Sequence, residues 1–414
     1  MNGNVYKWMV VAMLWLICMF NYSDRQAIAS VFPLLQSEFS LTAVQLGWMV
    51  SSFMWVYAGA GWLAGMTGDR YHRKSVIIGG LIFWSIITYL IGVSTAYWHL
   101  VVLRALQGLG EAFYFPAAMS LLSDYHGKDT RSRAMGIHQS AVYTGTVIGG
   151  SLTGWLAQSY GWRFSFYLFG GAGILLGLFL LFTLKEPRRG QSEENGVAKE
   201  VPALSFREIF RNILVIYRIP MVRVLTLVFI GANFVAAIFL TWLPKYLFDQ
   251  FHMTLAMSGF SATAYLQAGS IAGVLLGGVI ADRWARRRFG GRALSQSVGL
   301  FLGAPFLFLM GWTFSVPALV AAMGLYGICK GIYDANIWAS LHDVVLPEHR
   351  STAVGVMNSL AWLGGGLATM AIAVAAPTFG MSACLSATSV IYLAFGALLL
   401  LGTRRYMKAP SRTH

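Results

Sequence analysis

The chain has 414 residues, of which 57% are hydrophobic and 11% are charged, and its formal net charge is +14. Soluble globular proteins carry about 25% charged residues, so the composition excludes a large soluble enzyme and an extended disordered chain. Twelve spans of roughly 20 residues would use about as many positions as there are hydrophobic residues. The apolar runs are continuous, which excludes an outer-membrane barrel and favours a polytopic helical membrane protein.

The apolar runs between charged, glycine or proline breaks predict twelve transmembrane helices. Their approximate limits are 8–35, 44–66, 75–95, 98–123, 133–158, 164–184, 222–248, 258–281, 294–313, 317–342, 352–376 and 382–402. One long polar segment divides them into six and six. We therefore expect an N-terminal six-helix bundle (1–184), a cytoplasmic linker (185–221) and a C-terminal six-helix bundle (222–414).

Lysine and arginine are distributed unevenly along this pattern. Of the 30, 25 fall at the two termini and in the loops after even-numbered spans, whereas the loops after odd-numbered spans hold two, Arg163 and Lys245. Because basic loops stay inside the cell, this asymmetry places both termini in the cytoplasm of a multi-pass protein of the cell (inner) membrane. The basic balance is thus a topology signal, and we expect a lipid bilayer and no nucleic acid as partner.

An internal repeat links the two halves. The segments 65–74 and 278–287 both read Gly-x-x-x-Asp-Arg-x-x-Arg-(Lys/Arg). A second set of matches, at nearly the same offset along the chain, pairs Asp124, Arg131 and Gly136 with Asp343, Arg350 and Gly355. The repeats predict a duplicated six-helix unit, and transporters built in that way bind substrate near the bilayer midplane.

The loop motif at 65–74, its echo at 278–287 and the six-plus-six pattern resemble the major facilitator superfamily over essentially the whole chain. Within it, Asn-Tyr-Ser-Asp-Arg at 21–25 and the pair Arg104 and Glu111 look like the anion:cation symporter family. The segments 185–190 and 303–309 look closer to the Spinster-like lysolipid transporters. The resemblance implies an all-α membrane protein with twelve transmembrane helices in two pseudo-symmetric six-helix bundles.

Ionisable residues inside the predicted spans are the main candidates for function, since a charge at the bilayer centre costs about 2.5–3.5 kcal/mol on insertion scales. The planar fork of arginine holds a carboxylate or phosphate with two hydrogen bonds, so Arg25 and Arg104 are candidate anion ligands. A carboxyl group buried in an apolar cavity can exchange a proton near neutral pH, so Asp24 and Glu111 are candidate proton carriers. The resemblance assigns the same roles. The alternative is a structural network in which Asp24 pairs with Arg104 or Arg25.

The second half differs from the first at the position of Glu111, because the offset that pairs Asp124 with Asp343 places Lys330 there. Lys330 and Asp334 are one helical turn apart and could neutralise each other on one helix face. Alternatively, Lys330 binds a second anionic or polar group of the substrate and Asp334 joins the proton coupling. Further substrate-contact candidates, each of which could instead serve helix packing, are Tyr22, Tyr57, Tyr114 and Asn358.

The repeated loop motif predicts a cytoplasmic gate. Its charges can form charge-assisted bonds across the cytoplasmic face and hold one arrangement of the halves closed. Charges that only set the topology are the alternative reading. The gate candidates are Asp69, Arg70, Arg73 and Lys74 in the first copy, and Asp282, Arg283, Arg286 and Arg287 in the second.

These features predict a proton-coupled symporter of a small organic anion, a carboxylate or sugar acid, which works by alternating access as a monomer. The alternative is a Spinster-like transporter of a lysolipid or other amphiphile. A membrane enzyme is not expected, because the sequence lacks Gly-x-Ser-x-Gly, His-Glu-x-x-His and phosphate-loop motifs. The three cysteines lie in apolar runs without paired spacing, so neither a metal nor another cofactor is expected.

Overall fold

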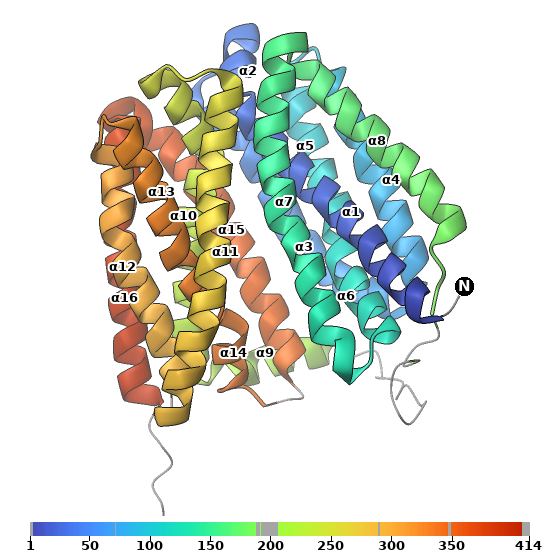
Figure 1. The fold of residues 1–414 in the computed structure, drawn as a ribbon, viewed down its shortest axis with the longest axis vertical. Coiled ribbons are helices and arrows are strands. Elements are labelled where there is room, and N and C mark those ends of the chain that lie inside the picture. Colours follow the sequence, from blue (N-terminus) through green and yellow to red (C-terminus); the bar gives the residue numbers. More distant parts are fainter. Residues whose placement is uncertain are drawn as a thin grey trace, which may run out of the picture. The chain divides into compact units, whose positions relative to one another are not determined.

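The structure is a computed structural model (Figure 1), and its described part consists entirely of helices and connecting segments. It describes residues 3–70, 72–187, 191, 206–288, 290–346 and 349–407. Within these ranges, side chains are not described at 3–4, 62–63, 65–70, 128, 132, 206–210, 212 and 351. Nine helical segments of this described part are long and apolar enough to cross a membrane.

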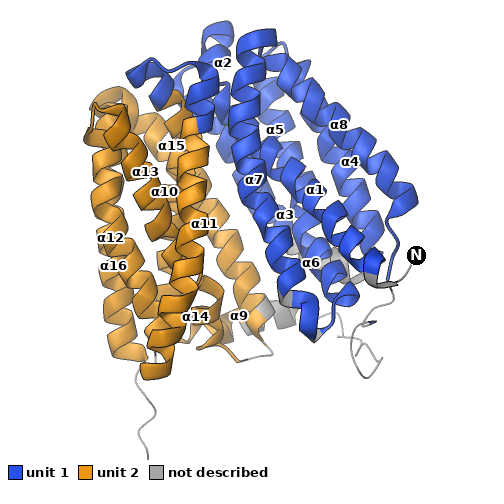
Figure 2. Ribbon diagram, in the orientation of Figure 1, with its two compact units in different colours: residues 1–203, 247–260 blue, residues 204–246, 261–414 orange. Residues whose placement is uncertain are grey.

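The chain forms two compact units (Figure 2), residues 1–203 with 247–260 and residues 204–246 with 261–414. The predicted bundle limits of 1–184 and 222–414 stay a prediction. In the first unit, α1 packs on α7, α4 on α8, and α3 on α5. Its helices are α1 (Gly3–Ser30), α2 (Phe32–Phe39), α3 (Ala43–Arg70), α4 (Arg73–Gly92), α5 (Tyr97–Ala112), α6 (Tyr114–Tyr125), α7 (Lys128–Tyr160) and α8 (Trp162–Thr183).

In the second unit, α12 packs against both α13 and α16. The packing of α12 on α16 repeats that of α4 on α8, the corresponding helices of the first unit. The remaining helices, of which α11 begins among the residues assigned to the first unit, are α9 (Phe206–Tyr217), α10 (Pro220–Phe251), α11 (Leu255–Arg287), α12 (Gly291–Trp312), α13 (Val316–Asp334), α14 (Ile337–His342), α15 (Arg350–Phe379) and α16 (Met381–Tyr406).

Each of the twelve predicted spans corresponds to one helix or to two consecutive helices. The spans at 8–35, 98–123 and 317–342 are divided into α1 and α2, α5 and α6, and α13 and α14. Two of these breaks have a proline as their cause, since Pro33 and Pro116 lack the backbone N–H and crowd the carbonyl four residues earlier. The predicted all-α membrane architecture is therefore confirmed, with three spans interrupted.

The two halves of the chain contain equivalent helix–helix contacts at matching positions of the repeat. A Cβ atom added at Gly108 on α5 would lie 2.5 Å from the carbonyl oxygen of Phe53 on α3. At Gly327 on α13 it would clash in the same way with the carbonyl oxygen of Leu266 on α11. The sequence offset that aligns the two loop motifs also aligns Phe53 with Leu266. The offset that aligns Asp124 with Asp343 also aligns Gly108 with Gly327. Only glycine permits such close backbone approach, so the same glycine-dependent helix packing occurs in both repeats.

Replacing Gly108 with alanine is therefore expected to destabilise the protein by about 1–3 kcal/mol, the usual cost of overpacking. Gly327→Ala should have a similar effect. The matched control is Gly79→Ala on α4, where nothing lies within 4 Å of the added Cβ atom. The measurement is the thermal unfolding midpoint of each purified protein in one detergent. Equal midpoints for Gly108→Ala and Gly79→Ala would contradict the close approach.

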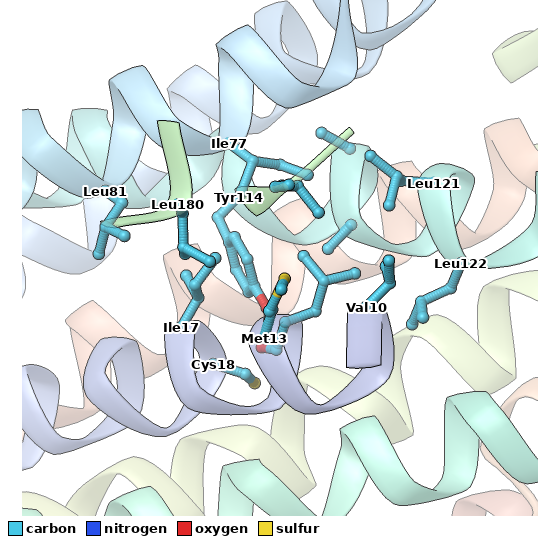
Figure 3. Close-up of a cluster of buried hydrophobic side chains, with 14 of the residues drawn as sticks. Val10, Met13, Ile17, Cys18, Ile77, Leu81, Tyr114, Leu121, Leu122 and Leu180 are labelled. Atoms are coloured by element: carbon cyan, nitrogen blue, oxygen red, sulfur yellow. The ribbon is translucent and has the colours of Figure 1, made fainter. Parts of the chain in front are cut away.

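The core of the first unit is an apolar cluster from α1, α4, α6, α7 and α8, in which Tyr114 stands among aliphatic side chains (Figure 3). The Tyr114 hydroxyl donates to the carbonyl oxygen of Leu14 at 2.6 Å and lies 2.7 Å from Nε2 of His138. A phenol has one hydrogen, so His138 donates to the Tyr114 oxygen. This pair fastens α6 to both α1 and α7.

Candidate functional site

The first feature of the site is a buried ion pair between α1 and α5. Arg25 donates from Nε to Oε2 of Glu111 at 2.6 Å; the Glu111 side chain is fully buried and that of Arg25 is 10% exposed. The guanidinium carbon of Arg25 lies 4.6 Å from the ring centre of Tyr22 and 4.5 Å from that of Tyr57. Aromatic faces attract a cation that is removed from water. Arg25 is thus held by one carboxylate and two tyrosines.

The second arginine lies beside the same aromatic ring as the first. Arg104 lies 4.5 Å from the ring centre of Phe53, and Arg25 lies 5.4 Å from it. Arg104 is 1% exposed, donates to Oε1 of Gln107 at 2.7 Å, and approaches the carbonyl oxygen of Met49 at 3.4 Å. The structure therefore brings the two predicted anion ligands together around Phe53.

The third feature is a chain of hydrogen bonds from Arg104 to Asp24. Gln107 donates from Nε2 to Oγ1 of Thr88 at 3.2 Å, and Thr88 donates to Oδ2 of Asp24 at 3.4 Å. Asp24 is 1% exposed. Thus each candidate proton carrier is associated with one candidate anion ligand, Glu111 directly with Arg25 and Asp24 with Arg104 through Gln107 and Thr88.

The binding and coupling candidates of the second half lie on α13 and α15 of the second unit. Lys330 and Asp334 form an ion pair one turn apart on α13, with side chains 17% and 26% exposed. Asn358 lies half-buried on α15. Of the remaining candidates, Tyr22 and Tyr57 lie beside Arg25, whereas Tyr114 belongs to the core cluster of the first unit. The roles of all these residues in binding stay predictions.

The loop motif builds a network at the start of α4. Arg73 forms ion pairs with Asp124 and, at 3.0 Å, with Glu186. The Glu186 carboxylate also accepts the backbone N–H groups of Arg73 and Lys74 at 3.3 and 2.7 Å. A carboxylate at a helix N-terminus is favoured by the exposed N–H groups and the helix dipole. Lys74 donates to the carbonyl oxygen of Leu181 at 2.8 Å. The side chains of Asp69 and Arg70 lie outside the described residues.

The second copy of the motif is arranged differently. Arg292 donates to Asp343 at 2.7 Å and lies 3.7 Å from Asp282, whose side chain is 62% exposed. The remaining gate candidates of this copy are all exposed, namely Arg283, Arg286 and Arg287. Asp343, the repeat counterpart of Asp124, therefore pairs with Arg292 instead of with the counterpart of Arg73. A gating role for either copy stays a prediction.

Sequence reasoning missed Phe53, Thr88 and Gln107 in the site, and Glu186 and Arg292 in the motif networks. Gln107 carried a usable signal, since it follows Arg104 by three positions and so lies on the same helix face. Thr88 carried none, because a single threonine in an apolar span is usually a packing residue.

The model of the Major Facilitator Superfamily matches residues 14–369 of the chain. The chain belongs to the Major Facilitator Superfamily. It is accordingly a multi-pass membrane protein of a transporter family, and the fold expected from the loop motif and its repeat is confirmed.

The curated relatives of this superfamily member include both sugar-acid transporters and Spinster proteins. It is 29% identical over 382 residues to the probable galactarate/D-glucarate transporter of Bacillus subtilis (strain 168), covering 85% of this chain and 82% of that protein. It is also 29% identical over 380 residues to human protein spinster homolog 1, covering 86% and 70%. Among solved structures, a bacterial homologue of the human lysosomal transporter Spinster, in an inward-facing and unoccupied conformation, matches with a TM-score of 0.84. That likeness covers 98% of this chain and 99% of the other at 24% identity, and it concerns the fold.

Proposed function

We propose that the protein is a proton-coupled symporter of a small organic anion, a carboxylate or sugar acid, which works by alternating access. The observation that carries the proposal is the buried Arg25–Glu111 pair with Arg104 beside the same aromatic ring, that of Phe53. The basic loops further support an inner-membrane protein with both termini in the cytoplasm.

The coupling follows from competition for Arg25. An anion that binds the Arg25 guanidinium displaces Glu111, which would then be a buried charge without a partner. Uptake of a proton by Glu111 removes that cost, because a neutral acid is far cheaper to bury than a carboxylate. Loss of the proton restores the ion pair and expels the anion. The anion and the proton therefore bind and leave together.

The second candidate function is transport of a lysolipid or another amphiphile. It is favoured by the match to spinster homolog 1, whose identity to this chain equals that of the galactarate/D-glucarate transporter. The two functions differ in the ligand that stabilises the purified protein.

The test is a thermal-shift screen of the purified protein against carboxylates, sugar acids, phosphates and lysolipids. A ligand that binds only the folded state at 100 times its Kd stabilises it by about 2.7 kcal/mol. We expect the sugar acids or other carboxylates to raise the unfolding midpoint, more so at acidic pH. Stabilisation by lysolipids alone would overturn the anion proposal in favour of the amphiphile.

Lys330 is expected to bind a second anionic or polar group of the substrate. Replacing Lys330 with methionine and Asp334 with asparagine removes the α13 ion pair without leaving a lone charge. If Lys330 makes a charged hydrogen bond to the substrate, its loss costs about 1.5–3 kcal/mol, or tenfold and more in affinity. Asp334→Asn alone, which keeps Lys330, should retain substrate exchange. Normal uptake by the double variant would show that the pair is structural.

A further inference from the structure

Four buried side chains from three helices form one continuous chain of hydrogen bonds. They are Arg104 and Gln107 on α5, Thr88 on α4 and Asp24 on α1, joined by distances of 2.7, 3.2 and 3.4 Å. None of the four is more than 1% exposed. Buried polar groups are almost always hydrogen-bonded, so the partner of each of these hydrogens decides how the chain is ordered.

The donor and acceptor of every hydrogen bond in this chain are determined by the groups at its two ends, Arg104 and Asp24. A guanidinium only donates, so Gln107 must present its carbonyl oxygen to Arg104 and its NH₂ group to Thr88. Thr88 accepts from Gln107 and has one hydrogen, which it donates to Oδ2 of Asp24. An ionised carboxylate only accepts. With Asp24 ionised, one orientation of the Gln107 amide therefore satisfies the whole chain.

Protonation of Asp24 reverses this order. Oδ1 of Asp24 has no hydrogen-bond partner among the described residues, so a proton there would be a buried donor without an acceptor. A proton on Oδ2 can donate to the Thr88 oxygen, and the Thr88 hydrogen, which has lost its acceptor, is then free to turn toward Gln107. In the proposed state Gln107 rotates its amide and offers the carbonyl oxygen to that hydrogen. Its NH₂ group now faces Arg104, where two sets of donors meet and the hydrogen bond is lost.

The charged groups that act on Asp24 are Arg25 on α1 and Arg104 and Glu111 on α5. Helices α4, α6 and α8 carry their charged residues in their end turns, and those of α7 lie within its first six residues. His138, which lies in the body of α7, is bonded to Tyr114. Thr88 and Gln107 are thus the polar side chains that connect Asp24 to Arg104.

We propose that Thr88 and Gln107 are positioning residues that release Arg104 for the anion when Asp24 takes up a proton. The proposal rests on the proposed symport and adds a second route of coupling beside the Arg25–Glu111 pair. The released guanidinium regains a partner in the anion, so anion binding and protonation of Asp24 favour each other to the same extent. Neither Thr88 nor Gln107 touches the anion in this scheme.

The test is the pH dependence of D-glucarate binding to the purified full chain, measured by calorimetry between pH 5.5 and pH 8. We expect wild-type affinity to rise at least tenfold toward acidic pH. Thr88→Val removes the hydroxyl at nearly constant shape and should reduce that rise to about threefold or less, the remainder coming from Glu111. Thr88→Ser keeps the hydroxyl and should restore the wild-type rise.

Two comparisons separate this role from a structural one. Thr146→Val is the matched control, since Thr146 is a buried threonine of the same unit that bonds within its own helix, to the carbonyl oxygen of Val142 at 2.8 Å. It should keep the wild-type pH response. In an Asp24→Asn background, Thr88→Val should have little further effect on the pH response, because the carboxyl group whose protonation Thr88 transmits to Gln107 is gone.

The possible failures are distinguishable. A wild-type pH response that persists in Thr88→Val would overturn the switch and leave the proposed symport intact. An equal loss from Thr88→Val with and without Asp24→Asn would likewise overturn it, because a packing defect acts regardless of Asp24. Absence of D-glucarate binding to the wild-type protein at any pH would overturn the proposed sugar-acid function and the switch together.

Discussion

Replacing Arg25 with lysine is expected to abolish most anion binding although the positive charge is kept. The Arg25 guanidinium faces Glu111 through Nε and lies against the rings of Tyr22 and Tyr57. Lysine offers one compact ammonium group, which neither stacks in the same way nor forms two parallel hydrogen bonds with a carboxylate. Loss of one charged hydrogen bond, about 1.5–3 kcal/mol, lowers the affinity tenfold or more.

The measurement is the Kd for D-glucarate in Arg25→Lys and Arg104→Lys proteins at acidic pH. Arg104 meets Phe53 and Gln107 with its planar group, so the same argument applies to it. Arg211→Lys, at an exposed position of α9, is the matched control and should bind like the wild type. Undiminished affinity in both site variants would mean that the anion is held elsewhere.

The fold could be predicted because a bilayer leaves few choices. Continuous apolar runs must become helices that satisfy their own backbone groups, and the basic loops set their orientation. The breaks at Pro33 and Pro116 were not predicted, since proline is tolerated inside transmembrane helices. The repeat was visible in the loop motif, but the contact of Gly108 with Phe53 and of Gly327 with Leu266 was not. Glycine is frequent in such helices, and spacing alone does not say which one meets a neighbour.

The candidate site could be predicted in its residues and less well in its connections. Buried charges identified Asp24, Arg25, Arg104 and Glu111, because such groups are costly in a membrane. The sequence suggested Asp24 as the structural partner of an arginine, whereas the structure pairs Arg25 with Glu111. Pairing depends on how each helix is rotated about its axis and on which helices are neighbours. Residue spacing within one helix determines neither of these.

Replacing Glu111 with glutamine is expected to separate binding from coupling. Glutamine resembles the protonated acid, so the anion no longer competes with a carboxylate for Arg25. Substrate binding and counterflow exchange should survive, while accumulation driven by a pH gradient should fall to what protonation of Asp24 alone supports. The free protein should be less stable, since removing one partner of a buried pair leaves the other charge uncompensated, at a cost of about 3–5 kcal/mol. Bound anion should recover much of that loss.

The measurement is paired uptake and exchange in proteoliposomes with a pH step across the membrane. Glu38→Gln is the matched control, because Glu38 at the end of α2 also pairs with an arginine, Arg163, at 2.6 Å. The hydrogen bonds from Arg163 hold the pKa of Glu38 below its usual value, so this carboxylate stays ionised across the pH step and carries no proton. Accumulation should therefore persist in Glu38→Gln. If Glu111→Gln concentrates substrate as well as the wild type does in response to the step, Glu111 carries no coupling proton and the competition for Arg25 is not a coupling device.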